Sequence, residues 1–454
     1  MPSSTNKRAF RRNQGLKRWQ RPRGRKPGED ALEDPNGSNR KLARTGRSWT
    51  ALREDLHRRR AGDLDWSDLR NLKASYNAGE DVADVAWQAY SLFQGDNLLY
   101  GNLLYPSLPA MAEEVVEMAL ELFDAPEEAC GTVTSGGTES IILAVKTARD
   151  WAQSERPVPG RGEIVVGRTC HAAFNKAAEM LGLRVVRVAT DAGFRADPAA
   201  MAAAITENTI MIVGSAPAYP IGCLDPIGAL AALAREHRVW LHVDACVGGF
   251  FLPFARDLGE TLPDFDFSLT GVTSMSADLH KYGYTSRGAS LLLLRDRDLS
   301  RFQRFSFSDW PSGEFVTMTI AGSRPGGAVA SAWAVMSYLG QDGYRQRVEA
   351  ILNIRRRLLA RVDELAGVRV LGSPAAGIVG LGGDGNFDMA ALRDTMAAKG
   401  WQFGPLVDPP GMNLLLNFRH GAIIDAFVVD LAETLADAKA GKLERSIQPA
   451  RYGG

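Results

Sequence analysis

Residues 269–294 read LTGVTSMSADLHKYGYTSRGASLLLL, and we expect the rest of the chain to be organised around them. The apolar run Leu291–Leu294 is typical of a buried strand, and the Ser, Gly and Tyr residues before it indicate a turn. Lys281 lies in that turn, directly after His280. A lysine amine can form a Schiff base with an aldehyde cofactor. The alternative is a surface lysine in a polar loop, so a second signal is needed.

The second signal is the stretch WLHVDACVGG at 240–249, which predicts an apolar strand with Asp244 at its carboxyl end. Ligands of open α/β sheets bind at the carboxyl ends of the strands. Pyridoxal phosphate requires a lysine for its aldehyde carbon and a carboxylate that keeps its pyridine nitrogen protonated. Lys281 and Asp244 together therefore predict an enzyme with this cofactor, in which both residues are catalytic.

A glycine pair opens a predicted helix in the stretch CGTVTSGGTES at 130–140. Glycine lets the backbone approach a ligand closely, and the free N–H groups and dipole at a helix start favour an anion. The pattern alone is common, but it gains weight beside the lysine and the aspartate. Gly136, Gly137 and Thr138 are therefore predicted to bind the cofactor phosphate.

These segments resemble the pyridoxal-phosphate-dependent group II decarboxylase superfamily, and within it they most resemble the sphingosine phosphate lyases. The resemblance rests on VDACVGGF at 243–250, GVTSMSADLHKYGY at 271–284 and AGSRPGG at 321–327, and it covers roughly residues 62–344. It implies a fold-type I architecture and a pyridoxal phosphate cofactor. It also implies an obligate homodimer, in which the last of these loops reaches the partner's active site.

The resemblance assigns further residues to the cofactor. His171 follows a predicted strand and matches the residue that stacks on the pyridine ring, so it is placed with the catalytic and cofactor-binding residues. A capping or otherwise hydrogen-bonded histidine is the structural alternative. Ser276 and His280 flank the lysine and are expected to bind the cofactor phosphate.

Three residues are expected to hold a second phosphate, that of the substrate. Tyr76 occupies the place of a tyrosine segment of the family, and Arg287 stands six residues after Lys281, where the family commonly has a lysine. Arginine keeps the charge and adds a bidentate fork. The family usually has a histidine within the segment 96–107, whereas this chain has none there and Tyr100 is the nearest substitute.

The activity implied by the resemblance is that of an aldehyde-lyase of sphingolipid metabolism. Such an enzyme cleaves a phosphorylated sphingoid base by retro-aldol chemistry to phosphoethanolamine and a long-chain aldehyde. One alternative is an amino-acid decarboxylase on the same scaffold, in which Arg419 would hold the substrate carboxylate. The other is a non-catalytic scaffold that binds anionic partners through a basic N-terminal tail.

The amino-acid composition limits the remaining function classes. Lysine plus arginine and aspartate plus glutamate number 53 each among 454 residues, so net charge favours no nucleic-acid partner. The four cysteines lie far apart without metal-ligand spacing, which predicts a reducing compartment and no metal site. No signal peptide or long apolar run is present, so we expect a cytoplasmic protein without a transmembrane segment. Eukaryotic sphingosine phosphate lyases carry a membrane anchor, and the chain is expected to match the soluble bacterial type instead.

Short β-rich runs alternate with Ala-rich helical ones, which predicts an α/β fold with a mostly parallel sheet flanked by helices. The predicted strands of this sheet are 164–166, 184–188, 209–213, 239–243 and 290–294. We expect four regions: a basic disordered tail (1–48), a helical segment that contributes to the active site and the dimer (49–108), a large cofactor-binding domain (109–343) and a small C-terminal α/β domain (344–454).

Overall fold

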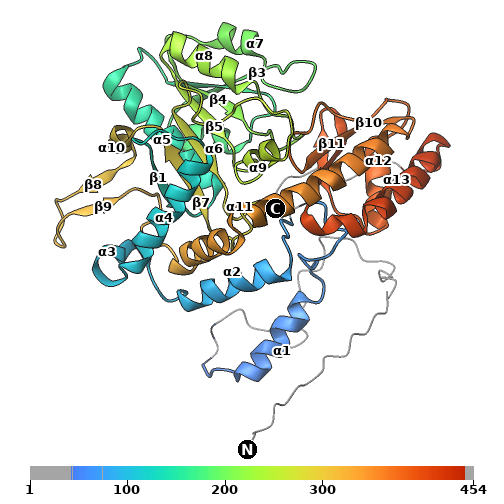
Figure 1. The fold of residues 1–454 in the computed structure, drawn as a ribbon, viewed down its shortest axis with the longest axis horizontal. Coiled ribbons are helices and arrows are strands. Elements are labelled where there is room, and N and C mark those ends of the chain that lie inside the picture. Colours follow the sequence, from blue (N-terminus) through green and yellow to red (C-terminus); the bar gives the residue numbers. More distant parts are fainter. Residues whose placement is uncertain (1–41, 43, 74, 445–454) are drawn as a thin grey trace, which may run out of the picture. The chain divides into compact units, whose positions relative to one another are not determined.

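The computed structural model describes residues 42, 44–73 and 75–444 (Figure 1). It divides into two compact units, one ending at Leu64 and the other beginning at Asp65. The described part of the first unit contains helix α1 (Trp49–Arg60), whose start is capped by the Ser48 hydroxyl. This helix lies at the start of the helical segment expected at 49–108, and most of the predicted basic tail (1–48) lies outside the described residues.

A seven-stranded sheet forms the centre of the second unit, in the order β1-β7-β6-β5-β4-β2-β3. Its strands are β1 (Cys130–Thr134), β2 (Glu163–Gly167), β3 (Arg184–Val188), β4 (Thr209–Ser215), β5 (Trp240–Asp244), β6 (Ser274–Ala277) and β7 (Ser290–Leu294). Neighbours from β3 to β6 pair in parallel, whereas β7 is antiparallel to both β1 and β6. The predicted mostly parallel sheet is confirmed.

Alternate residues of the central strands enter two separate cores, one on each face of the sheet. On β7, Leu291 and Leu293 face one core, and Leu292 and Leu294 face the other. Because side chains alternate along a strand, an unbroken apolar run fits a strand that is covered on both faces. Each fully buried leucine contributes about 1.5–3 kcal/mol relative to an exposed one.

Helices cover both faces of this sheet (Figure 1). Those packed around it include α4 (Ser107–Leu122), α5 (Gly137–Glu155), α6 (Ala173–Met180), α7 (Pro198–Ala204), α8 (Ile227–His237) and α9 (Leu252–Asp257). Residues of α5 and α6 fill the core on one face, and residues of α4, α8 and α9 belong to the core on the other.

Strand β6 was not predicted, since the sequence indicates a turn across its residues. Its four residues, SMSA, include two serines and no apolar run, yet all four are buried. The buried hydroxyls form hydrogen bonds with side chains of the neighbouring strand β5. The Ser274 hydroxyl lies 2.8 Å from Nδ1 of His242 and accepts a hydrogen bond from the Trp240 indole N–H at 2.7 Å. Such cross-strand pairs are not visible in local sequence patterns.

A four-stranded antiparallel sheet follows in the C-terminal part, in the order β10-β11-β13-β12. Its elements are β10 (Val368–Val370), β11 (Ile378–Gly383), α12 (Met389–Ala398), β12 (Gly404–Val407), β13 (Pro410–Leu415), η3 (Phe418–Ala422) and α13 (Ile424–Lys439). The long α11 (Gly326–Asp363) precedes it and is interrupted at Gly340, where φ is 53° and ψ is −174°. The boundary expected at residue 344 thus falls inside α11.

Several shorter elements complete the second unit. These are α2 (Glu80–Leu92), η1 (Leu98–Tyr100), α3 (Gly101–Leu104), η2 (Arg297–Leu299), α10 (Ser300–Gln303), β8 (Phe305–Phe307) and β9 (Phe315–Thr317). Strands β8 and β9 form a separate two-stranded hairpin that was not predicted. Within the described residues, no helix combines the length and apolar character needed to cross a bilayer.

Candidate active site

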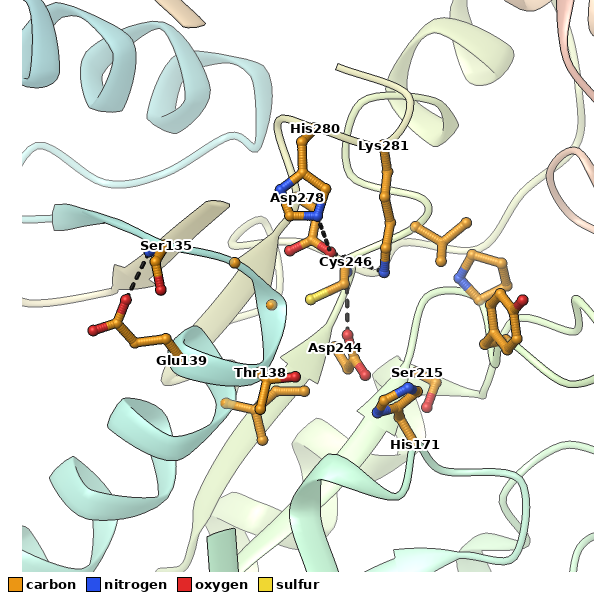
Figure 2. A pocket seen from close by; sticks show the side chains of 16 residues that line it. Ser135, Thr138, Glu139, His171, Ser215, Asp244, Cys246, Asp278, His280 and Lys281 are labelled. Carbon is orange, nitrogen blue, oxygen red and sulfur yellow. Dashed lines mark hydrogen bonds and ion pairs between the residues drawn. The ribbon is translucent and has the colours of Figure 1, made fainter. Parts of the chain in front are cut away.

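A pocket lies at the ends of several strands of the central sheet (Figure 2). Its lining residues are Ser135, Gly136, Gly137, Thr138, Glu139, Ile141, His171, Ser215, Pro217, Tyr219, Asp244, Cys246, Val247, Asp278, His280 and Lys281. Seven of the residues predicted to bind the cofactor are thus brought together, although they come from four separate segments of the chain.

The glycine pair forms the turn between β1 and α5. Gly136 has φ 152°, in the region that favours glycine, and α5 begins at Gly137. A side chain at Gly137 would place its Cβ 2.7 Å from Oδ1 of Asp278, so only glycine fits there without displacing the carboxylate. The start of this 19-residue helix therefore faces the pocket. A ligand can approach its backbone closely there, and the helix dipole favours an anion.

Glu139 fixes the turn to a distant loop. Its carboxylate accepts the backbone N–H of Ser135 at 2.7 Å, of Ile320 at 2.9 Å and of Ala321 at 3.3 Å. Burial raises the pKa of Glu139, but these hydrogen bonds outweigh it and leave the pKa below its ordinary value. The glycine turn and the 320–321 backbone are thereby held by one ionised side chain.

Asp244 ends β5 and points into the pocket. Its Oδ1 accepts the Cys246 N–H at 3.1 Å and the Ser276 hydroxyl at 3.4 Å. Behind it, Nε2 of His242 lies 3.1 Å from the same hydroxyl and Nδ1 contacts Ser274. Burial lowers the pKa of His242 to about 4, so its imidazole is neutral at pH 7. A continuous buried hydrogen-bond network therefore orients Asp244.

The structure does not bring Ser276 to the glycine turn, where it was expected to bind phosphate. Ser276 is fully buried on β6, does not line the pocket, and contacts Asp244, His242 and Cys246. The reason is the register of β5 and β6, which pairs Ser276 with Asp244 and brings their side chains together. Its geometry fits a support for Asp244 rather than a phosphate ligand.

Lys281 and His280 lie in the loop between β6 and β7, together with Asp278, which the sequence analysis did not select. Nζ of Lys281 is 2.8 Å from Oδ2 of Asp278, and Nε2 of His280 is 3.7 Å from the same oxygen (Figure 2). Burial lowers the pKa of Lys281, but the Asp278 carboxylate raises it well above its ordinary value. The signal available in the sequence was an aspartate three residues before the lysine.

His171 lines the pocket in the turn that precedes α6. Its Nδ1 accepts the Ala173 N–H at 3.1 Å, which orients the ring. Burial lowers the pKa of His171, and the nearby Asp244 carboxylate raises it without cancelling that effect. A neutral, oriented imidazole that lines the pocket suits the predicted stacking on a cofactor ring.

The residues expected to hold a substrate phosphate are arranged differently. None of Tyr76, Tyr100 and Arg287 lines the pocket as the described residues form it. Tyr76 packs edge-on against Tyr282 with ring centroids 4.9 Å apart, and burial raises its pKa, while the charges of Lys281 and Arg287 lower it. The charges of Lys281 and Arg287 therefore act on its hydroxyl.

Tyr100 and Arg287 are both exposed, and the side chain of Tyr100 is 46% accessible. Arg419, expected to hold a carboxylate in a decarboxylase, lies in η3 and does not line the pocket either. Tyr219 does line it. It follows β4 in the chain, and no role was predicted for it.

The pocket suits pyridoxal phosphate in charge and in hydrogen-bonding capacity. Among the described residues, three buried polar atoms without a hydrogen-bond partner belong to its lining: Ser215 Oγ, Asp278 Oδ1 and His280 Nδ1. Unpaired buried polar atoms are costly and are normally satisfied by a ligand or water. With a glycine turn for phosphate, a carboxylate and a lysine also present, the donor set fits this cofactor.

Comparisons with known proteins agree with this geometry. The model of the "Pyridoxal-dependent decarboxylase conserved domain" matches residues 34–380. A sphingosine-1-phosphate lyase of Oryza sativa subsp. japonica is 37% identical over 393 residues, which are 85% of this chain and 72% of the relative. A probable L-aspartate decarboxylase of Pyrococcus furiosus is 33% identical, covering 75% of this chain and 89% of that protein.

The structure of a sphingosine-1-phosphate lyase of Burkholderia pseudomallei superimposes with a TM-score of 0.85 at 34% identity. The match covers 89% of this chain and 94% of that one.

Proposed function

Because the chain belongs to the pyridoxal-dependent decarboxylase family, and within it to the sphingosine-1-phosphate lyases, we propose that it cleaves a phosphorylated sphingoid base to phosphoethanolamine and a long-chain aldehyde. The observation that carries this proposal is the 34% identity to a lyase structure across almost the whole of both chains. The cofactor is pyridoxal phosphate.

Bound pyridoxal phosphate supplies an electron sink that lets a carbon–carbon bond beside the substrate amine break. Lys281 holds the aldehyde carbon of the cofactor and, once released, can move protons. Asp244 keeps the pyridine nitrogen protonated, supported by its contacts to Cys246 and Ser276. His171, as a neutral imidazole oriented by the Ala173 N–H, would stack on the pyridine ring.

The cofactor phosphate is assigned to the start of α5 and to His280. Backbone N–H groups at Gly136, Gly137 and Thr138 have no intrahelical acceptors at a helix start, so they are available to an anion. A Cβ on Gly136 would meet Cε1 of His280 at 3.4 Å, which supports the proximity of that ring to the turn. The unpartnered Nδ1 of His280 is the donor we assign to the phosphate.

The substrate phosphate is assigned to Arg287 and Tyr76, whose charge and hydroxyl lie near each other. Retro-aldol cleavage also requires a group that takes the proton of the substrate hydroxyl. Tyr219, which lines the pocket, is the phenol that we assign to this step. Both assignments follow from position and from the hydrogen-bonding capacity of a phenol.

A homodimer is part of the proposal. Tyr100, Leu103 and Leu104 are 46%, 80% and 65% exposed within one short segment. Apolar side chains gathered on a surface are typical of a site that another protein covers. Sedimentation equilibrium should therefore give twice the chain mass, and Leu103→Glu should shift the protein toward monomer.

A decarboxylase is the second candidate, since a relative named a probable L-aspartate decarboxylase is 33% identical. Arg419 was the residue expected to bind the substrate carboxylate in a decarboxylase. It does not line the pocket, which argues against the decarboxylase. A non-catalytic scaffold is disfavoured by the set of cofactor residues that line the pocket.

The deciding experiment incubates the holoenzyme separately with sphingosine 1-phosphate and with L-aspartate. Fatty aldehyde and phosphoethanolamine should form in equal amounts from the first substrate, with no carbon dioxide from the second. Carbon dioxide release without aldehyde would replace the lyase by the decarboxylase. Absence of both products, from protein that carries the cofactor, would overturn both candidates.

A further inference from the structure

We propose that Asn413, in the C-terminal sheet, is a positioning residue that fixes Tyr219 at the active-site pocket by holding the backbone carbonyls of residues 219 and 220. The inference rests on the proposed function, in which Tyr219 takes the proton of the substrate hydroxyl. It gives the C-terminal sheet a part in the reaction, although this sheet contributes no residue to the pocket lining as the described residues form it.

Asn413 occupies an unusual place for its residue type. It lies within β13, between Met412 and Leu414, and is 1% exposed. Asparagine is depleted in strands, and a buried amide costs free energy unless its groups are hydrogen-bonded. An apolar side chain would fill this position of the sheet at a lower cost, so the presence of an amide needs a reason.

The contacts of the Asn413 side chain supply that reason. Its Nδ2 donates to the carbonyl oxygen of Tyr219 at 2.7 Å and to that of Pro220 at 2.8 Å. Because both partners are acceptors, the NH2 group must face them. Oδ1 is then left buried without a hydrogen-bond partner among the described residues, which is unfavourable. The amide is therefore oriented toward the Tyr219 loop at the expense of its own oxygen.

The loop after Tyr219 is embedded in the C-terminal sheet. Ile221 and Cys223 are buried in a separate small core together with Leu371 and Leu406. The N–H of Gly380, on β11, donates to the Ile221 carbonyl at 3.3 Å. The loop is thus attached to this sheet by apolar packing and by the backbone.

Gly222 sets how closely the loop approaches the sheet. Its φ is 89°, in the region that favours glycine, and a Cβ on it would overlap the carbonyl oxygen of Ile378 on β11. The carbonyl of Gly222 accepts the Ala375 N–H at 2.9 Å. The two backbones are therefore in direct contact, and no side chain fits between them at this point.

Asn413 differs from these other contacts in what it holds. They bind residues 221–223, whereas Asn413 binds the carbonyl of Tyr219 itself. Because a peptide unit is planar, a fixed carbonyl restrains the backbone at Tyr219 and with it the direction in which the phenol leaves the chain. A reacting group displaced by about 1 Å can lose about a hundredfold in rate. We therefore expect the loss of Asn413 to lower kcat rather than substrate binding.

Asn413→Leu tests the positioning role, since leucine has a similar volume and removes both N–H donors together with the unpaired oxygen. The kcat for sphingosine 1-phosphate should fall by at least about tenfold, while KM stays within about twofold of wild type. Cofactor occupancy, measured on the same sample, should not change. An unchanged kcat would overturn the proposal. If the leucine variant does not fold, Asn413→Ala replaces it with the same expectation.

A double-mutant cycle shows whether Asn413 acts through Tyr219. Tyr219→Phe removes the phenol, so the position of the ring no longer matters for the proton step. Adding Asn413→Leu to Tyr219→Phe should then lower kcat by about twofold at most. Losses that simply add, or an unchanged kcat in Tyr219→Phe alone, would overturn the proposal.

Thr434→Val is the matched control for general damage to the C-terminal part. Thr434 is 1% exposed on α13, and its hydroxyl donates to the Asp430 carbonyl at 2.7 Å. Valine keeps the shape and removes this buried hydrogen bond, so the urea midpoint should fall while kcat stays at the wild-type value. A loss of kcat equal to that of Asn413→Leu would overturn the proposal, because any weakening of this part would then explain both.

The products of the wild type separate this inference from the proposed function. Wild-type protein that carries the cofactor and forms no aldehyde would overturn the proposed function, and the inference with it. Aldehyde from the wild type, combined with additive losses in the cycle, would overturn only the role of Asn413.

Discussion

The residues assigned to the cofactor and those assigned to the substrate phosphate occupy very different surroundings. Gly137, Asp244 and Lys281 line one pocket and are held by strands of one sheet or by the turns directly after them. Tyr100 and Arg287 are exposed and line no part of that pocket. The residues assigned to the cofactor therefore share one pocket, whereas the two assigned to the substrate phosphate lie outside the lining of that pocket.

The largest effect should come from removing the lysine. Lys281→Ala should lower the catalytic efficiency by at least about a thousandfold, since the residue both holds the cofactor and moves protons. Borohydride reduction followed by mass spectrometry of the intact protein should fix pyridoxal phosphate to the wild type and not to the variant. Fixation of the cofactor to another lysine would show that the assignment of Lys281 is wrong.

The next effect is on stability and tests the buried network behind Asp244. The pKa of His242 is about 4 in the fold and about 6.5 in an unfolded chain, so the unfolded state binds a proton first as the pH falls. The contribution of neutral His242 to the free energy of unfolding is fully present above pH 6.5 and is lost as the pH falls to 4. This loss amounts to about 3 kcal/mol at most.

Urea unfolding of the wild type and of His242→Gln at pH 7 and pH 4.5 measures this loss. The difference in the free energy of unfolding between the two proteins should shrink as the pH falls. His57→Gln, on the exposed face of α1, serves as the control and should follow the wild type at both pH values. A constant difference for His242→Gln would mean that its burial does not govern the titration.

Arg287 should give a smaller but clear effect on the substrate side. A charge-assisted hydrogen bond is worth about 1.5–3 kcal/mol, so Arg287→Ala should lower kcat/KM for sphingosine 1-phosphate by at least about tenfold. Cofactor occupancy, measured on the same sample, should not change. Arg287→Lys should recover part of the loss because the charge remains. Unchanged efficiency in Arg287→Ala would remove this residue from the substrate site.

The smallest effect is expected for Tyr100→Phe, which should change kcat/KM by about twofold or less. Tyr100 does not line the pocket of its own chain, and the substitution removes only a neutral hydroxyl. A loss as large as that of Arg287→Ala would contradict this expectation. It would show that Tyr100 reaches the pocket of a second copy, and the loss should then vary with protein concentration.

Residues next to strongly apolar strands could be predicted from the sequence. Asp244 ends the buried run of β5, so the local pattern located it, whereas the glycine pair before α5 was selected only in combination with Lys281 and Asp244. The fold class followed from the same alternation of strands and helices.

What could not be predicted depends on partners that are distant in the chain. Strand β6 is polar in sequence and is stabilised by His242 and Trp240 of the neighbouring strand. Ser276 was assigned to the phosphate because it is close to Lys281 in sequence, yet the register of β5 and β6 pairs it with Asp244. Asp278 was overlooked because its importance lies in its contacts and not in any pattern.

The antiparallel strand β7 has a consequence for the order in which the molecule assembles. Strands β6 and β7 are neighbours in sequence and pair directly, so the loop that carries Lys281 and Asp278 can close at little entropic cost. The glycine turn, by contrast, meets this hairpin through contacts such as that of Ser140 with Ser290, which are 150 residues apart. Contacts of such separation form slowly. We therefore expect the lysine and its carboxylate to come together early in folding, and cofactor capture to report the late closure of the sheet.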